Sequence, residues 1–254
     1  MAVEERETGA PAAERALDIL EFLEAREEPQ SLAEIVAGLG VPKASAHRLI
    51  GTLKMRGYVR QAGPRGGYTL GLRVLGLASR AAERLDIVQI AREPMQRLAA
   101  ATGEACQVSV LSGRSALCVA RVSSPAHPDV ALIGRPGSAF PLHAVAVGKA
   151  LLAFATEAVR EEYLAGELTA YTPFTHHTGE ALRVELDDVR RDGLARDIQE
   201  YKLGLCAMAV PLFDHDGAVN AALALPYLYG AEPADQVTHL IRTGREISQA
   251  LGAR

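Results

Sequence analysis

Apolar residues recur at helical spacing in three consecutive segments of the N-terminal region, residues 13–26, 32–39 and 42–55. The apolar positions are Ala16, Leu17, Ile19, Leu20, Phe22 and Leu23 in the first segment, Leu32, Ile35, Val36 and Leu39 in the second, and Ala46, Leu49, Ile50 and Leu53 in the third. Each pattern predicts an amphipathic helix whose apolar face is buried against its neighbours.

Polar and special residues mark the ends of these helices. Ser31 and Glu34 have the spacing of a capping box, in which each side chain bonds the backbone amide of the other residue. Gly38 and Gly40 tolerate the positive φ of a tight turn, and Pro42 suits the first turn of the third helix. The sequence therefore predicts short helices joined by tight turns.

Two short strands follow the third helix. Residues 58–61 and 68–70 have a strand-like composition, and the loop AGPRGG joins them. Three helices followed by a hairpin predict a winged helix-turn-helix domain over residues 13–70. The charged, alanine-rich residues 1–12 before this domain are expected to form a disordered tail.

Helical spacing continues from residue 71 to residue 102. We expect a linker helix over residues 71–86, with Asp86 or Pro94 marking the point at which one helix gives way to the next. A second domain then covers residues 87–254.

Hairpin signals lie on both sides of a helical block in this second domain. The expected strands are residues 106–111, 116–122, 129–133, 206–213 and 219–225, with turns at 135–137 and 214–217. The expected helices are residues 143–154, 157–164, 179–191, which Gly193 closes, and 235–251. This arrangement predicts an α+β domain in which helices pack on an antiparallel sheet.

The distribution of charge suggests what the first domain does. Residues 41–80 contain eight Lys and Arg residues and no Asp or Glu, whereas residues 1–40 and 81–254 carry net charges of −7 and −5. A basic segment in an otherwise acidic chain is typical of a protein that binds nucleic acid, although a solvated basic surface is the open alternative.

The polar side chains of the third helix and of the loop between the strands are the predicted DNA contacts. They are Lys43, Ser45, His47, Arg48, Thr52, Lys54 and Arg65. Lys43, Ser45 and Arg48 are expected to read base edges in a major groove. Lys54 and Arg65 are expected to contact phosphates or a minor groove. A lone histidine on a helix, such as His47, is more often a surface or phosphate contact than a base contact.

Composition and cysteine usage limit the other functions. No apolar run approaches the roughly 20 residues of a membrane span, and the first ten residues are acidic and polar, so we expect a cytoplasmic protein with no membrane partner. The cysteines, Cys106, Cys118 and Cys206, lie far apart in apolar runs, which predicts buried, inert thiols.

Enzyme and metal-site hypotheses have little support in the sequence. Cys206 with His215 as a thiol nucleophile lacks electropositive surroundings, and His143 with residues 176–177 lacks the spacing of known metal motifs. No phosphate-binding or dinucleotide motif occurs in the chain. We therefore expect no catalytic residues, no metal and no cofactor.

Ordered motifs in both halves resemble the IclR family of bacterial transcription regulators. In the first half they are RALDILEFL, SLAEIVAGLGVPKASAHRLIGTLKMRGYV and GGYTLGLRVLGLA, and in the second they are FPLHAVAVGKALLAF, YTPFT and VRRDGLARDIQEYKLGLCAMAVPLFDHDGAVNAALAL. The resemblance implies that residues 87–254 form a GAF-like domain that binds an effector and forms the oligomer. It also implies that the linker helix pairs with its twin in a dimer. A linker helix that packs only on its own domain is the alternative.

The same resemblance implies eight effector-binding positions. They are Leu132, Ala146, Val147, Asp197, Leu205, Ala207, Ala224 and Pro226. Relatives that sense small polar acids tend to present hydroxyl groups from the last strand, where Ala224 and Pro226 have none, and Val147 narrows the entrance. We therefore expect an effector with a substantial apolar part, such as an aromatic acid, a lactone or a terpenoid-like metabolite, rather than glyoxylate or pyruvate.

These observations predict a homodimeric or tetrameric, ligand-responsive transcription regulator that binds a pseudo-palindromic operator on double-stranded DNA. Two alternatives belong to other classes. A metabolite-binding protein or an enzyme with a non-functional DNA-binding module predicts no salt-sensitive gel shift. A protein-interaction adaptor predicts binding that resists salt.

Overall fold

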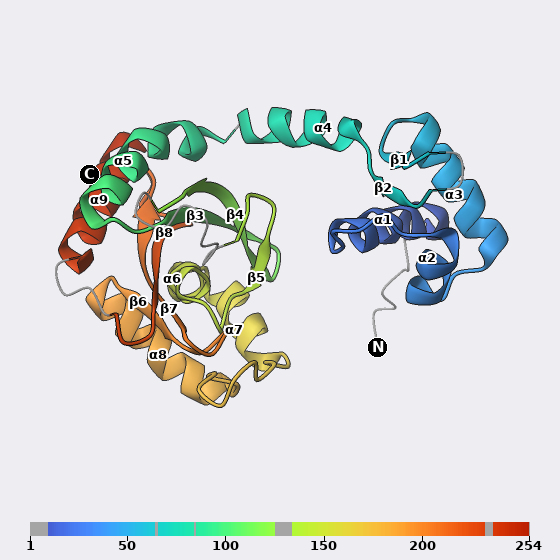
Figure 1. The fold of residues 1–254 in the computed structure, drawn as a ribbon. Coiled ribbons are helices and arrows are strands. Elements are labelled where there is room, and N and C mark those ends of the chain that lie inside the picture. The colour runs from blue at the N-terminus through green and yellow to red at the C-terminus, as the bar shows by residue number, and fades with distance from the viewer. Residues whose placement is uncertain (1–9, 64–65, 84, 125–133, 232–235, 254) are drawn as a thin grey trace. The chain divides into compact units, whose positions relative to one another are not determined.

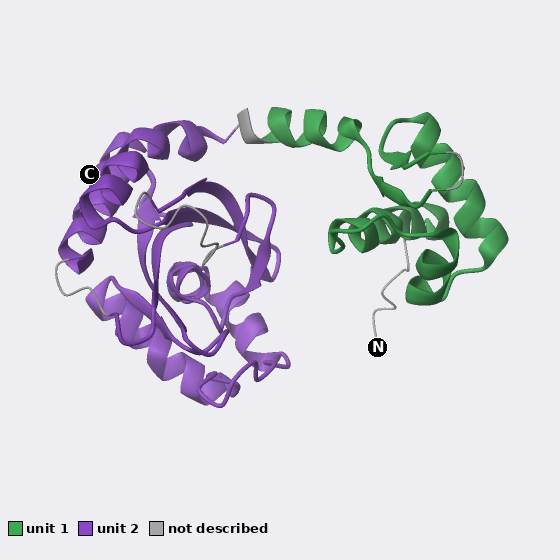
Figure 2. Ribbon diagram, viewed as in Figure 1, with its two compact units in different colours: residues 1–84 green, residues 85–254 purple. Residues whose placement is uncertain are grey.

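The computed structural model describes residues 10–63, 66–83, 85–124, 134–231 and 236–253. The chain forms two compact units, residues 1–84 and residues 85–254 (Figure 2). Within the first unit, the elements are α1 (Pro11–Glu24), α2 (Leu32–Leu39), α3 (Lys43–Met55), β1 (Val59–Gln61), β2 (Tyr68–Leu70) and α4 (Leu72–Glu83) (Figure 1). This order of helices and hairpin confirms the predicted winged helix-turn-helix.

The predicted apolar faces form the core of the first unit. Ile19, Phe22, Leu23, Ile35 and Ile50 are buried there, and the antiparallel β1–β2 hairpin closes one side. The first helix begins at Pro11 and so includes two residues that were expected in the tail. Residues 1–9 lie outside the described residues.

The predicted capping box at the start of α2 is confirmed. The Ser31 Oγ accepts a hydrogen bond from the Glu34 amide at 3.2 Å, and a Glu34 carboxylate oxygen accepts one from the Ser31 amide at 2.7 Å. Gly40 adopts the expected left-handed conformation, with φ of 62°. The role expected for Gly38 was wrong, because this residue is helical and a Cβ atom there would lie 2.1 Å from the Phe22 ring.

The second unit begins with α5 (Asp86–Thr102). Asp86 is the correct boundary, because Leu85 before it is extended and an acidic residue favours the first turn of a helix. Pro94 does not end a helix: it lies inside α5, where it is buried between Ala91 and Met95 in the core.

A six-stranded antiparallel sheet follows, in the order β5-β4-β3-β8-β7-β6. Its strands are β3 (Cys106–Ser112), β4 (Ser115–Val122), β5 (Ala139–Pro141), β6 (Ala195–Ile198), β7 (Leu205–Phe213) and β8 (Val219–Leu228). The remaining helices are α6 (Ala146–Phe154), α7 (Glu157–Ala165), α8 (Gly179–Asp192) and α9 (Gln236–Ala250). The predicted α+β class, with an antiparallel sheet and helices, is confirmed.

Helices cover both faces of the sheet. One face of the curled sheet surrounds α6, which α8 covers in turn, whereas α5 and α9 pack together on the opposite face (Figure 1). Two separate apolar cores result, one on each face. The alternation of side chains along the strands therefore decides which residues face α6.

Some boundaries in this unit differ from the prediction. The short edge strands β5 and β6 were not predicted, and α6 begins at Ala146 rather than at residue 143 because Val145 is extended. The expected strand at residues 129–133 lies outside the described residues. Among the helices of the described chain, none is long and apolar enough to cross a membrane.

Candidate functional site

The α3 helix presents most of the predicted DNA-binding residues on its outer surface. Lys43, His47, Arg48, Thr52 and Lys54 are exposed, and Ser45 is half-buried, while Ala46 and Ile50 are buried on the inner side. Ala44 and Gly51 are also exposed, and a Cβ atom at Gly51 would meet nothing within 4 Å. These small residues leave room for close approach to a groove.

Hydrogen bonds hold two members of this set. The Thr52 hydroxyl donates to the Arg48 carbonyl at 3.1 Å, and the Lys54 Nζ donates to the Gln61 Oε1 at 2.8 Å. The Gln61 Nε2 in turn donates to the Gly66 carbonyl, so this side chain links α3 to the wing. The sequence analysis missed Gln61, and Arg65 lies outside the described residues.

Seven of the eight predicted effector positions line a single cavity of about 470 Å³ in the second unit. They are Ala146, Val147, Asp197, Leu205, Ala207, Ala224 and Pro226. Leu132 lies outside the described residues. The α6 helix and strands β6, β7 and β8 contribute these side chains, so segments far apart in the sequence meet around one space.

Strand register explains this convergence. Asp197 pairs with Ala207, Ala207 pairs with Pro226, and Ala224 pairs with Ala209, so these side chains share the sheet face that packs against α6. The cavity lies beside the N-terminus of α6, where the N-cap residue Val145 makes no side-chain cap. Amide N–H groups at such an end favour an anion.

A larger depression in this unit contains none of the predicted effector-binding residues. It has a volume of about 870 Å³ and lies between α9 and the hairpin that joins β7 to β8. Its lining includes the exposed residues Asp216 and Arg245. The smaller cavity is the stronger candidate, because it combines apolar walls with buried polar groups.

Two buried polar side chains face the smaller cavity. Asp197 has only 3% of its surface exposed, and burial raises the pKa of its carboxyl group to about 7, although hydrogen bonds from the Glu200 and Tyr201 amides favour the charged form. Gln107 is 6% exposed, and its Oε1 atom has no hydrogen-bond partner among the described residues.

The sequence analysis missed several residues of the cavity wall. These are Gln107, Gly134, Phe140, Val145, Tyr201, Lys202, Leu203, Gly204 and Leu228. A signal existed for Gln107, because it is a polar residue inside the apolar run of a strand. Phe140 and Tyr201 contact each other edge to face, with ring centroids 5.9 Å apart, but nothing in their spacing indicates this contact.

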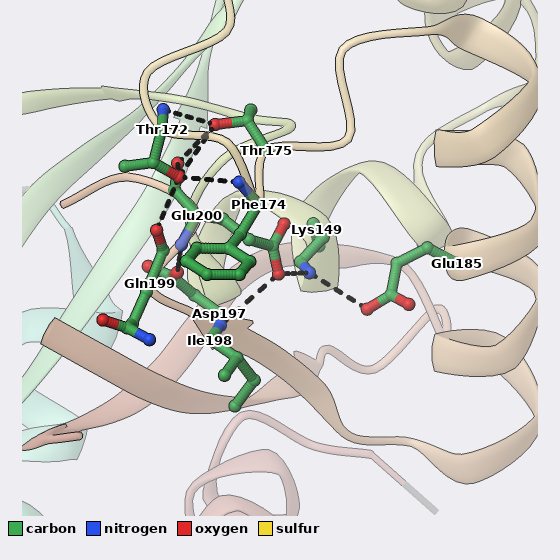
Figure 3. Close-up of polar contacts among 9 residues, drawn as sticks. All are labelled: Lys149, Thr172, Phe174, Thr175, Glu185, Asp197, Ile198, Gln199 and Glu200. Atoms are coloured by element: carbon green, nitrogen blue, oxygen red, sulfur yellow. Dashed lines mark hydrogen bonds and ion pairs between the residues drawn. The ribbon is translucent and has the colours of Figure 1, made fainter. Parts of the chain in front are cut away.

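A buried ion pair lies close to Asp197 (Figure 3). The fully buried Lys149 of α6 donates to a Glu200 carboxylate oxygen at 2.7 Å and to a Glu185 carboxylate oxygen at 3.0 Å. The Glu200 amide donates to Asp197 at 2.8 Å, and the Glu200 carbonyl accepts from the Thr175 hydroxyl. This network fixes the start of the loop whose residues 201–204 line the cavity.

The backbone of this loop is strained at its first residue. Gln199 has a φ of 61°, the one positive value at a non-glycine residue in the described chain. The Thr172 hydroxyl donates to the Gln199 carbonyl at 2.7 Å, and the Gln199 Oε1 accepts from the Gly204 amide at 2.8 Å. Local hydrogen bonds thus hold an unfavourable conformation where the loop leaves β6.

The geometry argues against the thiol and metal hypotheses. Cys206 is buried near the start of β7 and His215 follows its far end, a separation of about 30 Å for nine residues of strand. His143 is buried with its Nδ1 atom 2.9 Å from the Tyr163 hydroxyl and its Nε2 atom 2.9 Å from the Thr169 carbonyl, so both ring nitrogens are engaged.

Comparison with known proteins assigns both units. Residues 12–63 match the model of the IclR helix-turn-helix domain, and residues 79–249 match the model of the C-terminal domain of bacterial transcriptional regulators of the IclR type.

Individual relatives agree with these models. The chain is 32% identical to the HTH-type transcriptional regulator XynR of Escherichia coli K12, over 94% of this chain and 96% of that protein. It is 30% identical to the transcriptional repressor AllR of the same strain, over 97% and 92%. These relatives are transcription regulators rather than enzymes.

Solved structures show the same architecture. An IclR homologue from Microbacterium hydrocarbonoxydans, crystallised in complex with 4-hydroxybenzoate, has a TM-score of 0.82 and 28% identity, covering 94% of this chain and 98% of that one. The IclR protein of Thermotoga maritima has a TM-score of 0.75 and 25% identity, covering 96% of this chain and all of that one. The chain therefore belongs to the IclR family of DNA-binding transcription regulators, with a helix-turn-helix domain followed by an effector-binding domain.

Proposed function

We propose that this protein binds a pseudo-palindromic operator as a homodimer or tetramer, and that an aromatic acid bound in the cavity of the second unit changes its affinity for DNA. A single observation carries the effector part: seven of the positions that the family resemblance implied line one cavity, which combines apolar walls with two buried polar side chains. The complex of a relative with 4-hydroxybenzoate supports the same ligand class.

The chemistry of the cavity favours an aromatic acid over a small keto acid. Phe140 and Tyr201 supply aromatic surface, and Ala207 and Ala224 leave space above the sheet. The uncapped start of α6 suits a carboxylate. A molecule as small as glyoxylate would leave most of a cavity of about 470 Å³ unfilled.

The test measures binding to DNA and to ligand in one assay. Fluorescence anisotropy follows binding of the full-length protein to the DNA upstream of its own gene, at two salt concentrations and with 4-hydroxybenzoate, benzoate or glyoxylate. We expect salt-sensitive binding and a change in affinity of roughly 5- to 150-fold with an aromatic acid. An absence of salt-sensitive binding would refute the proposed function.

Two substitutions on α3 are expected to separate base reading from phosphate contact. Arg48→Ala should weaken operator binding by about tenfold or more and random-DNA binding much less, because a guanidinium contributes discrimination between bases. Lys54→Ala should weaken binding to both DNAs. It should also lower, by about one, the number of counterions released on binding, which the salt dependence of the affinity measures. Anisotropy titrations on the two DNAs measure these effects, and equal losses for Arg48→Ala on both would remove it from the base-reading set.

Gln61→Met is the matched control for Lys54. It breaks the 2.8 Å bond between Lys54 and the wing without removing a positive charge. If Gln61→Met reproduces the loss of Lys54→Ala with an unchanged salt dependence, Lys54 acts by holding the wing and not by contacting phosphate.

The proposed dimer uses the exposed leucines of α4. Leu72 and Leu75 are 81% and 65% exposed and lie three residues apart, on one side of the helix, so α4 presents an apolar surface for a second copy of itself. We expect Leu75→Glu to shift the protein towards monomer in sedimentation velocity experiments. Val184→Glu, at an exposed apolar position on α8, is the control that should leave the mass unchanged.

A further inference from the structure

Gln107 is a buried polar residue whose side chain faces the cavity of the second unit. It follows Cys106 at the start of β3, between side chains that are fully buried, and its own side chain lines the cavity. Its Oε1 atom accepts no hydrogen bond from the described residues. Leaving a buried amide oxygen unpaired is unfavourable by about 1–3 kcal/mol, so a ligand group that donates a hydrogen bond to this oxygen would gain affinity.

The sheet register places Gln107 and Asp197 on opposite sides of an apolar floor. Gln107 pairs with Ala224 on β8, and Asp197 pairs with Ala207 on β7, so three steps between neighbouring strands separate the two polar residues. Three such steps span about 14 Å. The floor between them consists of Ala207, Ala224 and Pro226, whose short side chains leave room for a flat ring.

The two ends of the cavity differ in charge. Gln107 is neutral, whereas Asp197 lies on β6 beside the loop that bears Lys202, a lysine at the exposed rim of the cavity. Lys202 at the rim and the uncapped start of α6 both favour a bound carboxylate, whereas the neutral Gln107 offers it no positive charge. A hydroxyl group suits Gln107, because it can donate to the amide oxygen and also accept from the amide nitrogen.

We propose that Gln107 selects the effector by hydrogen bonding a hydroxyl group that lies across the apolar body from the acid group, so that the natural ligands are hydroxylated aromatic acids. This inference rests on the proposed function, since it assumes that the cavity holds the effector. It adds a specificity-determining residue outside the eight positions that family resemblance indicated.

The test compares a matched pair of probes, 4-hydroxybenzoate and benzoate, by calorimetric titration of the full-length protein. Wild type is expected to bind 4-hydroxybenzoate about fivefold or more tightly than benzoate, the ratio that corresponds to one neutral hydrogen bond. Gln107→Met keeps a similar volume without polar atoms, and it should reduce the ratio to about one.

Ser109→Ala is the matched control. Ser109 is also fully buried on β3 with an unpartnered hydroxyl, but it does not line the cavity, so its replacement should leave the ratio unchanged. Gln107→Met should also raise the Tm of the ligand-free protein, because it removes an unpaired buried group. A rise in Tm establishes that the variant folds.

Several outcomes would overturn the inference. They are equal affinities of wild type for the two probes, an unchanged ratio in Gln107→Met, and binding of neither probe. In each case the anisotropy assay decides the proposed function separately. Salt-sensitive operator binding that another aromatic acid changes leaves the proposed function standing, whereas the absence of salt-sensitive DNA binding removes it.

Discussion

Replacing Lys149 by methionine is expected to lower the free energy of unfolding of the second unit by about 3–5 kcal/mol. Lys149 is fully buried in α6, and its Nζ atom bonds Glu200 at 2.7 Å and Glu185 at 3.0 Å. The substitution leaves the Glu200 carboxylate, which is 5% exposed, without its cation in a region of low dielectric. Urea denaturation followed by circular dichroism measures the loss as a lower midpoint.

Two further variants test the cause of this loss. Glu185→Gln should lower the free energy of unfolding much less than Lys149→Met does, because the Glu185 side chain is 26% exposed and can be solvated. The double variant Lys149→Met/Glu200→Gln should recover part of the stability, because no unpaired buried charge remains. If Lys149→Met lowers the free energy of unfolding as little as Glu185→Gln does, the buried Lys149–Glu200 pair does not stabilise this core.

The same substitution is expected to weaken effector binding. Glu200 connects Lys149 to Asp197 and, through its carbonyl, to Thr175, and the cavity-lining residues 201–204 follow it directly. Gln199, at the start of the loop, has a positive φ, and local hydrogen bonds stabilise this conformation. Without the ion pair, the loop loses the contact that fixes it to α6.

Local patterns predicted the first unit well. The capping box of Ser31 and Glu34, the left-handed Gly40 and the buried face of α3 depend on residues close in sequence, so helical periodicity suffices to place them. The exception is Gly38, whose small size serves close packing against Phe22 on another helix. That contact is not visible in the local sequence.

The second unit depends on contacts between distant segments. The strand β6 has only four residues and is an edge strand, and its existence follows from pairing with β7 rather than from an apolar pattern of its own. The sequence analysis contains Lys149 only inside the motif FPLHAVAVGKALLAF, because a lysine in an apolar helix gives no indication of the two glutamates that bind it. Family resemblance indicated that Asp197 lines the effector cavity, but it did not indicate Gln107 or Tyr201.

Replacing Asp197 by asparagine is expected to stabilise the protein increasingly as pH rises. Burial raises the pKa of Asp197 from its ordinary value of 3.8 to about 7 in the folded state, and the neighbouring Glu200 carboxylate acts in the same direction. Between these two pKa values the folded protein binds more protons than the unfolded chain. The stabilisation that comes from protonating Asp197 is therefore fully present below about pH 4, and it is lost as pH rises through 7.

The asparagine variant escapes this loss, because it keeps an oxygen to accept the Glu200 amide bond and never ionises. Denaturation at pH 5, 6, 7 and 8 should show its stability relative to wild type rising by about 3 kcal/mol up to pH 7 and then levelling off. Ser109→Ala, a buried substitution without a titrating group, should show no such trend. A difference for Asp197→Asn that is constant with pH would contradict the raised pKa.

Ligand binding provides a second measurement of the same ionisation. Above pH 7 the charged Asp197 carboxylate repels an anionic ligand in the cavity, whereas below pH 7 the neutral acid can donate a hydrogen bond to it. Wild type should therefore bind benzoate more weakly as pH rises from 6 to 8, and Asp197→Asn should show a smaller change. Because the acid group of the probe stays ionised over this range, a change that the substitution abolishes belongs to Asp197 and to the cavity that it lines.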